Sequence, residues 1–416
     1  MYTIYERRSA ILAANQTPVW VRNLRVLSVS VFFAGMGFSE IMPFLSLYVA
    51  TLGDFTTRQL TFYSGVVFAS MYVVSALTSP LWGKLADRIG RKPMLLRAAL
   101  GMAVVIAAMG LVQNVWELIL LRMAQGIFAG FVSNSNALIA TETPKAKAGR
   151  ALGTMAAGVT GGNLLGPLLG GSLAEIFSYR ATFLVTGGIL LLVFWACFFL
   201  VKEEGFTPVT AAKFDHASGV IKSLRSPQVV LGLLLTTMII QAANNSINPI
   251  VSLFVKELMH NGPGVTFVSG IIAALPGIAT MLAAPRLGRL GDRIGTQKIL
   301  IAGFLLSILC FVPSAFVRNP WQLGGFRFLI GIADAALFPQ VQTLLTKQTP
   351  SELTGRIFSW NQSTMYIGNI LGPLIGGAVA GWFDYGAVFL ATAGLVAVNL
   401  GLFLANVFFP LQKSQA

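Results

Sequence analysis

The sequence contains few charged residues, few histidines and few cysteines. Asp, Glu, Lys and Arg make up only 11% of its 416 residues, whereas a soluble domain usually carries about 25%. So few charges cannot solvate the surface of a soluble protein, and we expect the outer surface to face lipid. The two cysteines, Cys197 and Cys310, lie in separate apolar stretches without a CxxC pair, so neither a disulfide nor a metal site is indicated.

Sequence motifs of enzymes and ATP-driven pumps are also missing. There is no HExxH, no GxSxG and no cluster of His, Cys and acidic residues within one apolar stretch, which argues against a membrane-embedded enzyme. There is no GxxxxGK[ST] motif either, which disfavours an ATP-driven pump. The net charge of +14 arises from basic residues between the apolar stretches. We therefore expect no cofactor, no metal and no nucleic-acid partner.

Long apolar stretches dominate what is present, with 55% hydrophobic residues and a mean hydropathy of +0.74. A helix needs about 20 apolar residues to cross the hydrocarbon core of a bilayer. The pattern predicts an all-α polytopic membrane protein with twelve transmembrane helices. The predicted spans are residues 24–50, 60–84, 95–113, 116–141, 151–176, 181–201, 228–255, 265–288, 298–317, 321–346, 356–381 and 387–409.

The longest polar gap divides the chain into two halves. It predicts an N-terminal six-helix bundle over 1–201, a cytoplasmic linker over 202–227 and a C-terminal six-helix bundle over 228–416. Lys and Arg lie mainly on the side of the termini, and the opposite side has only Arg58, Arg180, Lys256 and Arg318. This asymmetry predicts that both termini are cytoplasmic. No signal-peptide pattern occurs near the start, so we expect the first span to be retained.

An internal repeat supports the division into halves. GKLADRIG from Gly83 to Gly90 recurs as GRLGDRIG from Gly288 to Gly295, and Arg122-x-x-x-Gly126 recurs at Arg327, both with an offset of 205. GNLLGPLLGG at 162–171 recurs as GNILGPLIGG at 368–377, with an offset of 206. Each half has an even number of spans, so the repeat is parallel. We expect two pseudo-symmetric bundles with a substrate site between them near the midplane.

These motifs resemble those of the major facilitator superfamily over nearly the whole chain. GKLADRIGRK, starting at Gly83, resembles the family's signature between spans 2 and 3. GNLLGPLLGG in span 5 resembles the motif of its drug/proton antiporter branch. The resemblance implies the family's fold, a cavity lined by spans 1, 4, 7 and 10, and antiport rather than symport.

The signature between spans 2 and 3 supplies candidate residues for a gate at the cytoplasmic side. In the family its aspartate, here Asp87, caps span 11 and latches the two halves together. The basic residues beside it could instead merely fix the topology, but topology alone does not explain the acid among them. The second copy departs from the pattern at Thr296 and Gln297. The candidate gate residues are Gly83, Asp87, Arg88, Gly90, Arg91 and Asp292.

The glycines of span 5 recur every four residues and therefore share one helix face, where small residues allow close helix approach. Pro167 is expected to bend the same helix. The pattern could serve general packing, but its second copy in span 11 favours a hinge or seal. The residues of this antiporter motif are Gly162, Gly166, Pro167, Gly170 and Gly171.

Ionisable residues inside spans are functional candidates because each costs about 2.5–3.5 kcal/mol at the membrane centre on insertion scales. Glu40 in span 1 could exchange a proton, meet a cationic substrate or be paired structurally. Arg122 in span 4 resembles an arginine that the family associates with proton coupling. It could tune Glu40, or it could snorkel towards the surface. Arg327 and Asp334 share one face of span 10, as a second proton site or as a structural pair.

Polar and aromatic residues in spans 4, 7, 10 and 11 are candidates for the substrate cavity. The amides are too numerous for helices that face only lipid, although each could instead form an interhelical hydrogen bond. The aromatic residues could form an adaptable wall or simply pack. The candidates, including one phenylalanine from span 1, are Asn134, Asn136, Gln241, Asn244, Asn245, Asn248, Phe44, Phe338 and Trp360.

The sequence thus predicts a secondary transporter of a bacterial inner membrane. The leading hypothesis is a monomeric proton-coupled antiporter that exports amphipathic or cationic drugs by alternating access. Its expected partners are a small-molecule substrate, protons and the lipid bilayer. The alternative is export of a metabolite, a sugar or a lipid-linked glycan.

Overall fold

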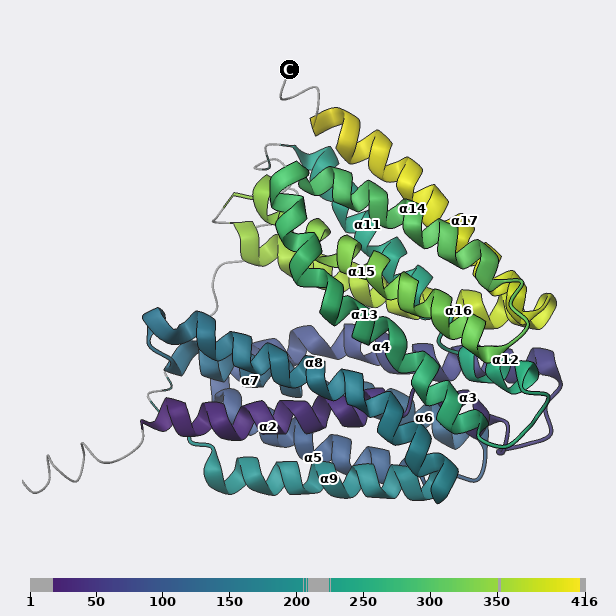
Figure 1. The fold of residues 1–416 in the computed structure, drawn as a ribbon. Helices are drawn as coiled ribbons and strands as arrows, with labels where there is room; N and C mark the ends of the chain where they lie inside the picture. The colour runs from purple at the N-terminus through teal and green to yellow at the C-terminus, as the bar shows by residue number, and fades with distance from the viewer. Residues whose placement is uncertain are drawn as a thin grey trace, which may run out of the picture.

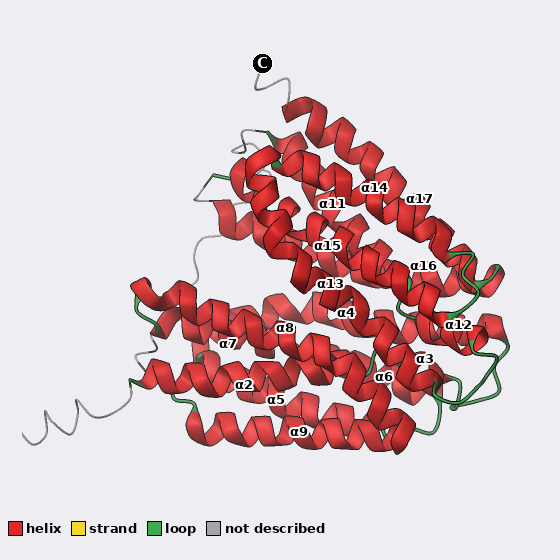
Figure 2. Cartoon of the chain, in the orientation of Figure 1, coloured by secondary structure: helices red, strands yellow, loops and turns green. Residues whose placement is uncertain are grey.

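The computed structural model describes residues 18–204, 206, 208, 224, 226–350 and 353–411. Every regular element in these ranges is helical and none is a strand (Figure 2). Most of the predicted linker lies outside the described residues. The N-terminal bundle contains α2 (Val19–Ser39), α3 (Leu45–Val49), α4 (Thr57–Ile89), α5 (Arg91–Met109), α6 (Val115–Ile127), α7 (Phe131–Glu142), α8 (Lys145–Ile176) and α9 (Tyr179–Leu200).

The C-terminal bundle repeats this order after the linker. It contains α11 (Pro227–Ser246), α12 (Val251–Leu258), α13 (Val265–Ile294), α14 (Thr296–Ser314), α15 (Pro320–Gln348), α16 (Thr354–Trp382) and α17 (Tyr385–Phe403), followed by the π-helical turn η2 (Leu404–Phe408). Within the described ranges, eleven segments are long and apolar enough to cross a membrane. The twelfth crossing is α8, which has 32 residues and is less apolar because of its glycines, Asn163 and Pro167. The predicted all-α polytopic fold is confirmed.

Three spans that the sequence predicted as continuous helices are broken in the structure. Residues 40–44 separate α2 from α3, residues 128–130 separate α6 from α7, and residues 247–250 separate α11 from α12. Pro43 and Pro249 explain two of the breaks because proline lacks an N–H and disfavours helix at the preceding residue. Gly130 explains the third, because its φ of +107° is left-handed. Breaks at membrane depth are tolerated only inside protein or beside a cavity, so we expect these three not to face lipid.

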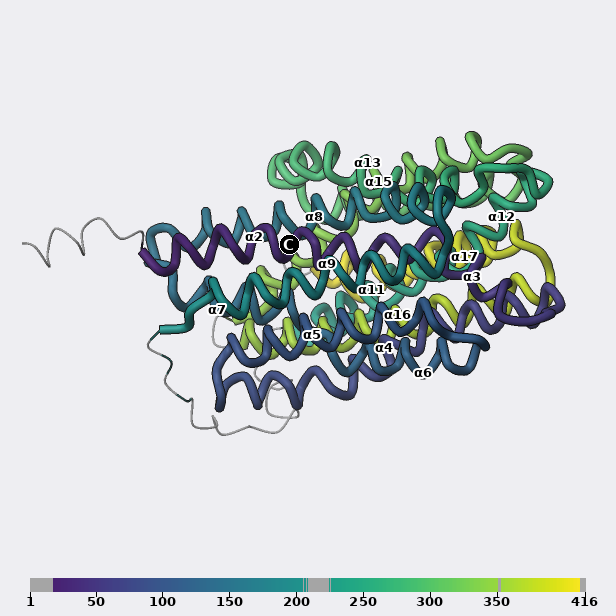
Figure 3. The backbone as a smooth tube through the Cα atoms, turned by 90° about the horizontal axis from the view of Figure 1, so that it is seen from below, coloured from purple at the N-terminus to yellow at the C-terminus, as the bar shows by residue number. Residues whose placement is uncertain are grey.

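The two bundles meet along two seams. Helix α4 packs against α16 at one seam and α8 packs against α13 at the other, while α3 touches α12. The bundles converge at the end that holds α3 and α12 and diverge towards the end that holds the linker (Figure 1). We call the diverging end, where the described chain starts and stops, the terminal face, and the converging end the opposite face. Seen from below, the helices of both bundles run side by side between these faces (Figure 3).

Glycines of α8 and α16 set the distance between helix backbones. A Cβ atom at Gly162, Gly166 or Gly170 would collide with the backbone of α2 or of Glu40, which follows it. A Cβ at Gly171 would instead meet α13, at 2.7 Å from the Thr266 carbonyl oxygen. The motif therefore serves two interfaces, one within the N-terminal bundle and one across the α8–α13 seam.

The same arrangement recurs in the C-terminal bundle. Gly368, Gly372 and Gly376 face α11, and Gly377 lies against Thr61 of α4. Because both copies pack in the same way, the sequence repeat corresponds to a repeat of helix contacts.

Replacing Gly376 with alanine tests whether this close approach holds the C-terminal bundle together. The added methyl group would overlap the Ser246 carbonyl group, so we expect a loss of about 1–3 kcal/mol in stability. Gly394 of α17 is the matched control, because it is exposed and a Cβ there meets nothing within 4 Å. Thermal melting in detergent should fall for Gly376→Ala and stay level or rise for Gly394→Ala. Equal melting temperatures would contradict the assignment.

Candidate functional site

Glu40 lies at the break that follows α2 and is enclosed by protein. Its side chain is only 1% exposed, and neither carboxyl oxygen has a hydrogen-bond partner among the described residues. Gly170 of α8 packs directly against its backbone, which fixes the position of the side chain. A buried ionised carboxylate without a partner is costly. The carboxyl group is therefore available to a proton or to a cationic ligand.

Arg122 of α6 is not paired with Glu40, contrary to the prediction. Its Nε donates to the Val67 carbonyl oxygen at 3.2 Å, and its Nη1 donates to Oε1 of Gln125 at 2.7 Å. The guanidinium group lies within electrostatic range of Tyr72, and no ion pair joins it to Glu40 in the described part of the chain. Arg122 does not snorkel either, because it is 1% exposed and bonds inward. It lies where α6 crosses α4, so it can act on Glu40 only over a longer distance.

Asp334 of α15 is held by an amide of α11. Nδ2 of Asn244 donates to Oδ1 of Asp334 at 2.8 Å. Arg327 lies on the same helix within electrostatic range of Asp334, and its Nε is buried without a hydrogen-bond partner in the described chain. The structure thus places an acid, an amide and a partly unsatisfied guanidinium group together inside the C-terminal bundle.

The remaining amides of α11 form a chain of hydrogen bonds around its break. Asn248 donates to Oδ1 of Asn245 at 2.9 Å, and Asn245 donates to Oδ1 of Asn369 at 2.9 Å and to the Gln241 carbonyl oxygen at 3.0 Å. The prediction had not included Asn369 of α16. Its signal was visible in the sequence, because it is the second residue of the repeated GN(L/I)LGP motif. These side chains are partly buried, so a ligand could exchange with their mutual hydrogen bonds.

The other predicted cavity residues divide into two groups. Asn134 bonds to the Gly130 carbonyl oxygen in its own span, while Oδ1 of Asn136 is buried without a partner among the described residues. Phe338 and Trp360 are half-buried against the core of the C-terminal bundle.

Phe44 does not belong to the cavity. It is fully buried and stacks on Tyr179 with ring centroids 5.7 Å apart. The break after Glu40 turns this side chain into the core of the N-terminal bundle, which the span position alone did not reveal.

The predicted cytoplasmic gate is not formed in this conformation. Oδ1 of Asp87 accepts from Nη2 of Arg91 at 2.6 Å. The α16 helix begins after Leu353 and receives no side-chain cap from the residues that the structure describes. Gly83, Arg88 and Asp292 are exposed. The acid therefore stays on its own bundle, as expected where the two bundles diverge.

The loop from α4 to α5 is instead fixed by the start of the linker. Gly90 joins the two helices with a φ of +103°, a left-handed conformation that favours glycine. The Glu203 carboxylate accepts from the Arg91 N–H at 2.7 Å and the Lys92 N–H at 2.8 Å, which caps α5. No sequence signal had singled out Glu203, because its partner lies more than a hundred residues away.

The bundles are joined towards the opposite face. Oγ of Ser46 donates to the Pro249 carbonyl oxygen at 2.7 Å and thereby links the breaks of the two halves. Along the α4–α16 seam, Oγ of Ser79 lies 3.2 Å from the Tyr366 hydroxyl. Tyr366 is also within electrostatic range of Tyr72, which in turn is within range of Arg122.

Two repeats joined at one face, with broken helices and an acid inside each bundle, define a secondary transporter of the alternating-access class. The chain matches the Major Facilitator Superfamily over residues 27–275 and 233–416. It belongs to this family and is a multi-pass membrane protein.

Relatives of known name cover almost the whole chain. It is 50% identical over 380 residues to the multidrug resistance protein MdtG of Dickeya zeae (strain Ech586), covering 91% of this chain and 93% of that protein. It is 49% identical over 386 residues to MdtG of Escherichia coli (strain K12 / DH10B), covering 92% and 94%.

Solved structures share the fold. A bacterial homolog of the human lysosomal transporter Spinster, in an inward-facing and occupied conformation, superposes with a TM-score of 0.77. It has 14% sequence identity, and the match covers 94% of this chain and 97% of that chain. At this identity the likeness concerns the fold alone.

Opposite effects on stability should distinguish Glu40, which is buried, from Asp334, which is partly buried. Glu40→Met removes a buried carboxyl group without a partner and keeps a similar volume, so we expect higher stability, by about 1 kcal/mol or more. Asp334→Leu leaves the Asn244 amide without its acceptor, so we expect a loss of about 1–3 kcal/mol. Thermal melting of both variants in detergent measures the difference. A loss on Glu40→Met as large as that on Asp334→Leu would show that Glu40 has polar partners.

Proposed function

We propose that the protein exports amphipathic or cationic drugs from the cytoplasm in exchange for protons. The relatives that are about half identical over more than nine-tenths of this chain bear the name multidrug resistance protein. The span-5 glycine motif, typical of antiporters, supports the same direction of transport. The observation that carries proton coupling is the burial of Glu40 without a hydrogen-bond partner in the described chain.

Glu40 and Asp334 are the proposed proton sites. They lie in different bundles, and neither has an acidic equivalent in the other half: Ser246 packs against Gly376 as Glu40 packs against Gly170. The proton pathway is therefore asymmetric within a repeated frame. Entry of one charge down the membrane potential supplies about 2.3 kcal/mol per 100 mV, which can drive the export of one drug molecule.

The proposed drug site lies between the bundles, near the amides of α11. Asn244, Asn245 and Asn369 offer exchangeable hydrogen bonds, and Asp334 offers a negative charge. Tyr72 and Tyr366 offer aromatic surface from opposite halves. Such a set suits a flat cation, because ring faces and a carboxylate both attract positive charge.

We assign the terminal face to the cytoplasm of a bacterial inner membrane, because the basic residues gather there. The conformation is then inward-facing, and Asp87 is expected to cap α16 when the bundles close at that face. We further propose that residues 202–227 act as a cytoplasmic linker between bundles 1–201 and 228–416, and that one chain is sufficient for transport.

Efflux of ethidium tests both the substrate class and the energy source. Cells that express the protein should lose ethidium faster than cells with an empty vector, and an uncoupler should abolish the difference. Fluorescence of intracellular ethidium measures the rate. Equal efflux with and without the uncoupler would exclude proton coupling, and the absence of efflux for a range of cationic drugs would exclude the proposed substrate class.

The two proton sites are tested by Glu40→Gln and Asp334→Asn. We expect each to reduce proton-driven ethidium efflux by tenfold or more and to flatten its dependence on external pH, because neither amide can carry a proton. Glu257→Gln is the matched control, since Glu257 is an exposed acid at the opposite face. Unchanged pH dependence in both test variants would show that the protons bind elsewhere.

A further inference from the structure

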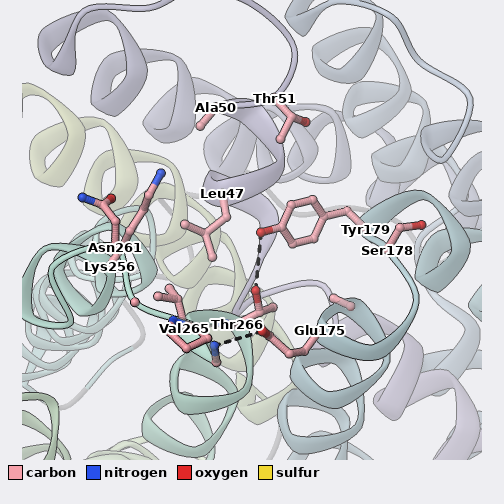
Figure 4. Close-up of a pocket in the computed structure, with 14 residues that line it drawn as sticks. Leu47, Ala50, Thr51, Glu175, Ser178, Tyr179, Lys256, Asn261, Val265 and Thr266 are labelled. Carbon is pink, nitrogen blue, oxygen red and sulfur yellow. Dashed lines mark hydrogen bonds between the residues drawn. The ribbon is translucent and has the colours of Figure 1, made fainter.

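The periplasmic end of the α8–α13 seam contains a pocket built by both bundles. Its volume is about 470 Å³. Leu47, Glu175 and Tyr179 contribute from the N-terminal bundle, and Lys256 and Thr266 contribute from the C-terminal bundle (Figure 4). Side chains from both halves point towards one another there, so the residues around the pocket are those that close the periplasmic side.

The Glu175 carboxylate caps a helix of the other half. Helix α13 begins after Gly264 and receives no cap from its own segment. Glu175 accepts from the Gly264 N–H at 3.0 Å and from the Thr266 N–H at 3.1 Å. Figure 4 shows Glu175 beside Val265 and Thr266 at this end of α13. These first N–H groups have no partner within the helix, and a negative charge there also meets the positive end of the helix dipole. The Tyr179 hydroxyl lies 3.4 Å from Oγ1 of Thr266 and adds a second contact across the seam.

The pseudo-equivalent seam has no such carboxylate. The offset of 206 places Gly381 of α16 at the position of Glu175, and a Cβ at Gly381 would lie 2.9 Å from Oγ1 of Thr61. Helix α4 is capped within its own segment, by Thr56 and Gln59 in a capping box. The fold therefore closes one seam without a capping side chain from the other half. Glu175 is an addition to the fold, not a requirement of it.

We propose that Glu175 is a gating residue that holds the periplasmic side closed. Its hydrogen bonds to α13 exist only while the periplasmic ends of α8 and α13 touch, so they break whenever the protein opens outwards. Lys256 lines the same pocket but forms no ion pair with Glu175 in the described chain, so the carboxylate is directed at the helix end. The inference rests on the alternating-access transport proposed above.

Glu175 is the periplasmic counterpart of the predicted cytoplasmic gate residue Asp87. Asp87, at the end of α4, is expected to cap α16 when the cytoplasmic side is closed. An acid at the end of α8 caps α13 when the periplasmic side is closed. Removing Glu175 should therefore shift the resting protein towards the outward-open state, while the drug and proton sites remain intact.

A distance measurement between the two halves tests this gate without substrate or proton gradient. Spin labels are attached to cysteines introduced at Asp54 and Arg318, two exposed positions at the periplasmic face, after Cys197 and Cys310 are replaced by alanine. Pulsed electron paramagnetic resonance then gives the ratio of outward-open to inward-facing molecules. We expect Glu175→Ala to raise this ratio about three- to tenfold, the effect of losing charge-assisted hydrogen bonds at an exposed site.

Two further variants make the result specific. Glu175→Gln should raise the ratio less, because its amide oxygen can still accept one N–H. Glu117→Ala removes another exposed acid at the same face. Its hydrogen bonds in the described chain stay within its own bundle, for example 2.8 Å from the Gln113 N–H, so the ratio should stay unchanged. An unchanged ratio in Glu175→Ala, or an equal rise in Glu117→Ala, would overturn the proposal. Because no drug transport is measured, failure of the gate and failure of the proposed function can be told apart.

Discussion

Direct backbone contact along the glycine faces of α8 and α16 is the constraint on which the rest of the structure depends. In lipid, helices gain little from burying apolar surface against one another, so association relies on close packing. Gly170 brings α8 so near that a Cβ there would collide with the Glu40 backbone. The helix face that holds the N-terminal bundle together therefore also positions the acid proposed to bind protons.

The same helices connect packing within a bundle to packing between bundles. Gly166 faces α2, while Gly171, further along α8, faces Gly270 of α13. A rocking of the two bundles must therefore part the contact at Gly171 while the contact at Gly166 persists. Short contacts without large side chains suit such a seam, because they can separate without repacking a core. Glu175, one turn beyond Gly171, adds hydrogen bonds to a helix interface that is otherwise lined by glycines.

The residues repeated in both halves account for the arrangement of the helices. The residues that differ between the halves account for the proposed function. Glu40 matches Ser246, Asp334 has no acidic equivalent, and Glu175 matches Gly381. Each of these acids is absent from the other half, although the glycines beside them are repeated. The repeated residues form two bundles that can rock against each other. Among the unrepeated acids, Glu40 and Asp334 are proposed to couple this motion to protons, and Glu175 is proposed to set the resting conformation.

The sequence predicted much of the architecture because hydrophobic length and a constant repeat offset are local, additive signals. It located the twelve spans, and its motifs identified the glycines that touch neighbouring helices. It singled out Asp334 as an ionisable residue inside span 10, but its hydrogen bond to Asn244 of span 7 was not predicted. It misplaced Phe44 because a helix break rotates the following side chains, and the period of an unbroken helix cannot show that rotation.

Long-range partners were beyond the reach of the sequence. Whether Arg122 meets Glu40 or the Val67 carbonyl group depends on how far α6 lies from α2, which no spacing along the chain records. The caps that Glu203 and Glu175 supply join residues about ninety or more positions apart, and no motif links them. The length of the apolar stretches and the repeat alone determined that this chain folds as two six-helix bundles in a membrane. The partner of each buried or capping acid was decided only by the tertiary structure, because hydrogen bonds depend on distances of about 3 Å between helices that packing alone sets.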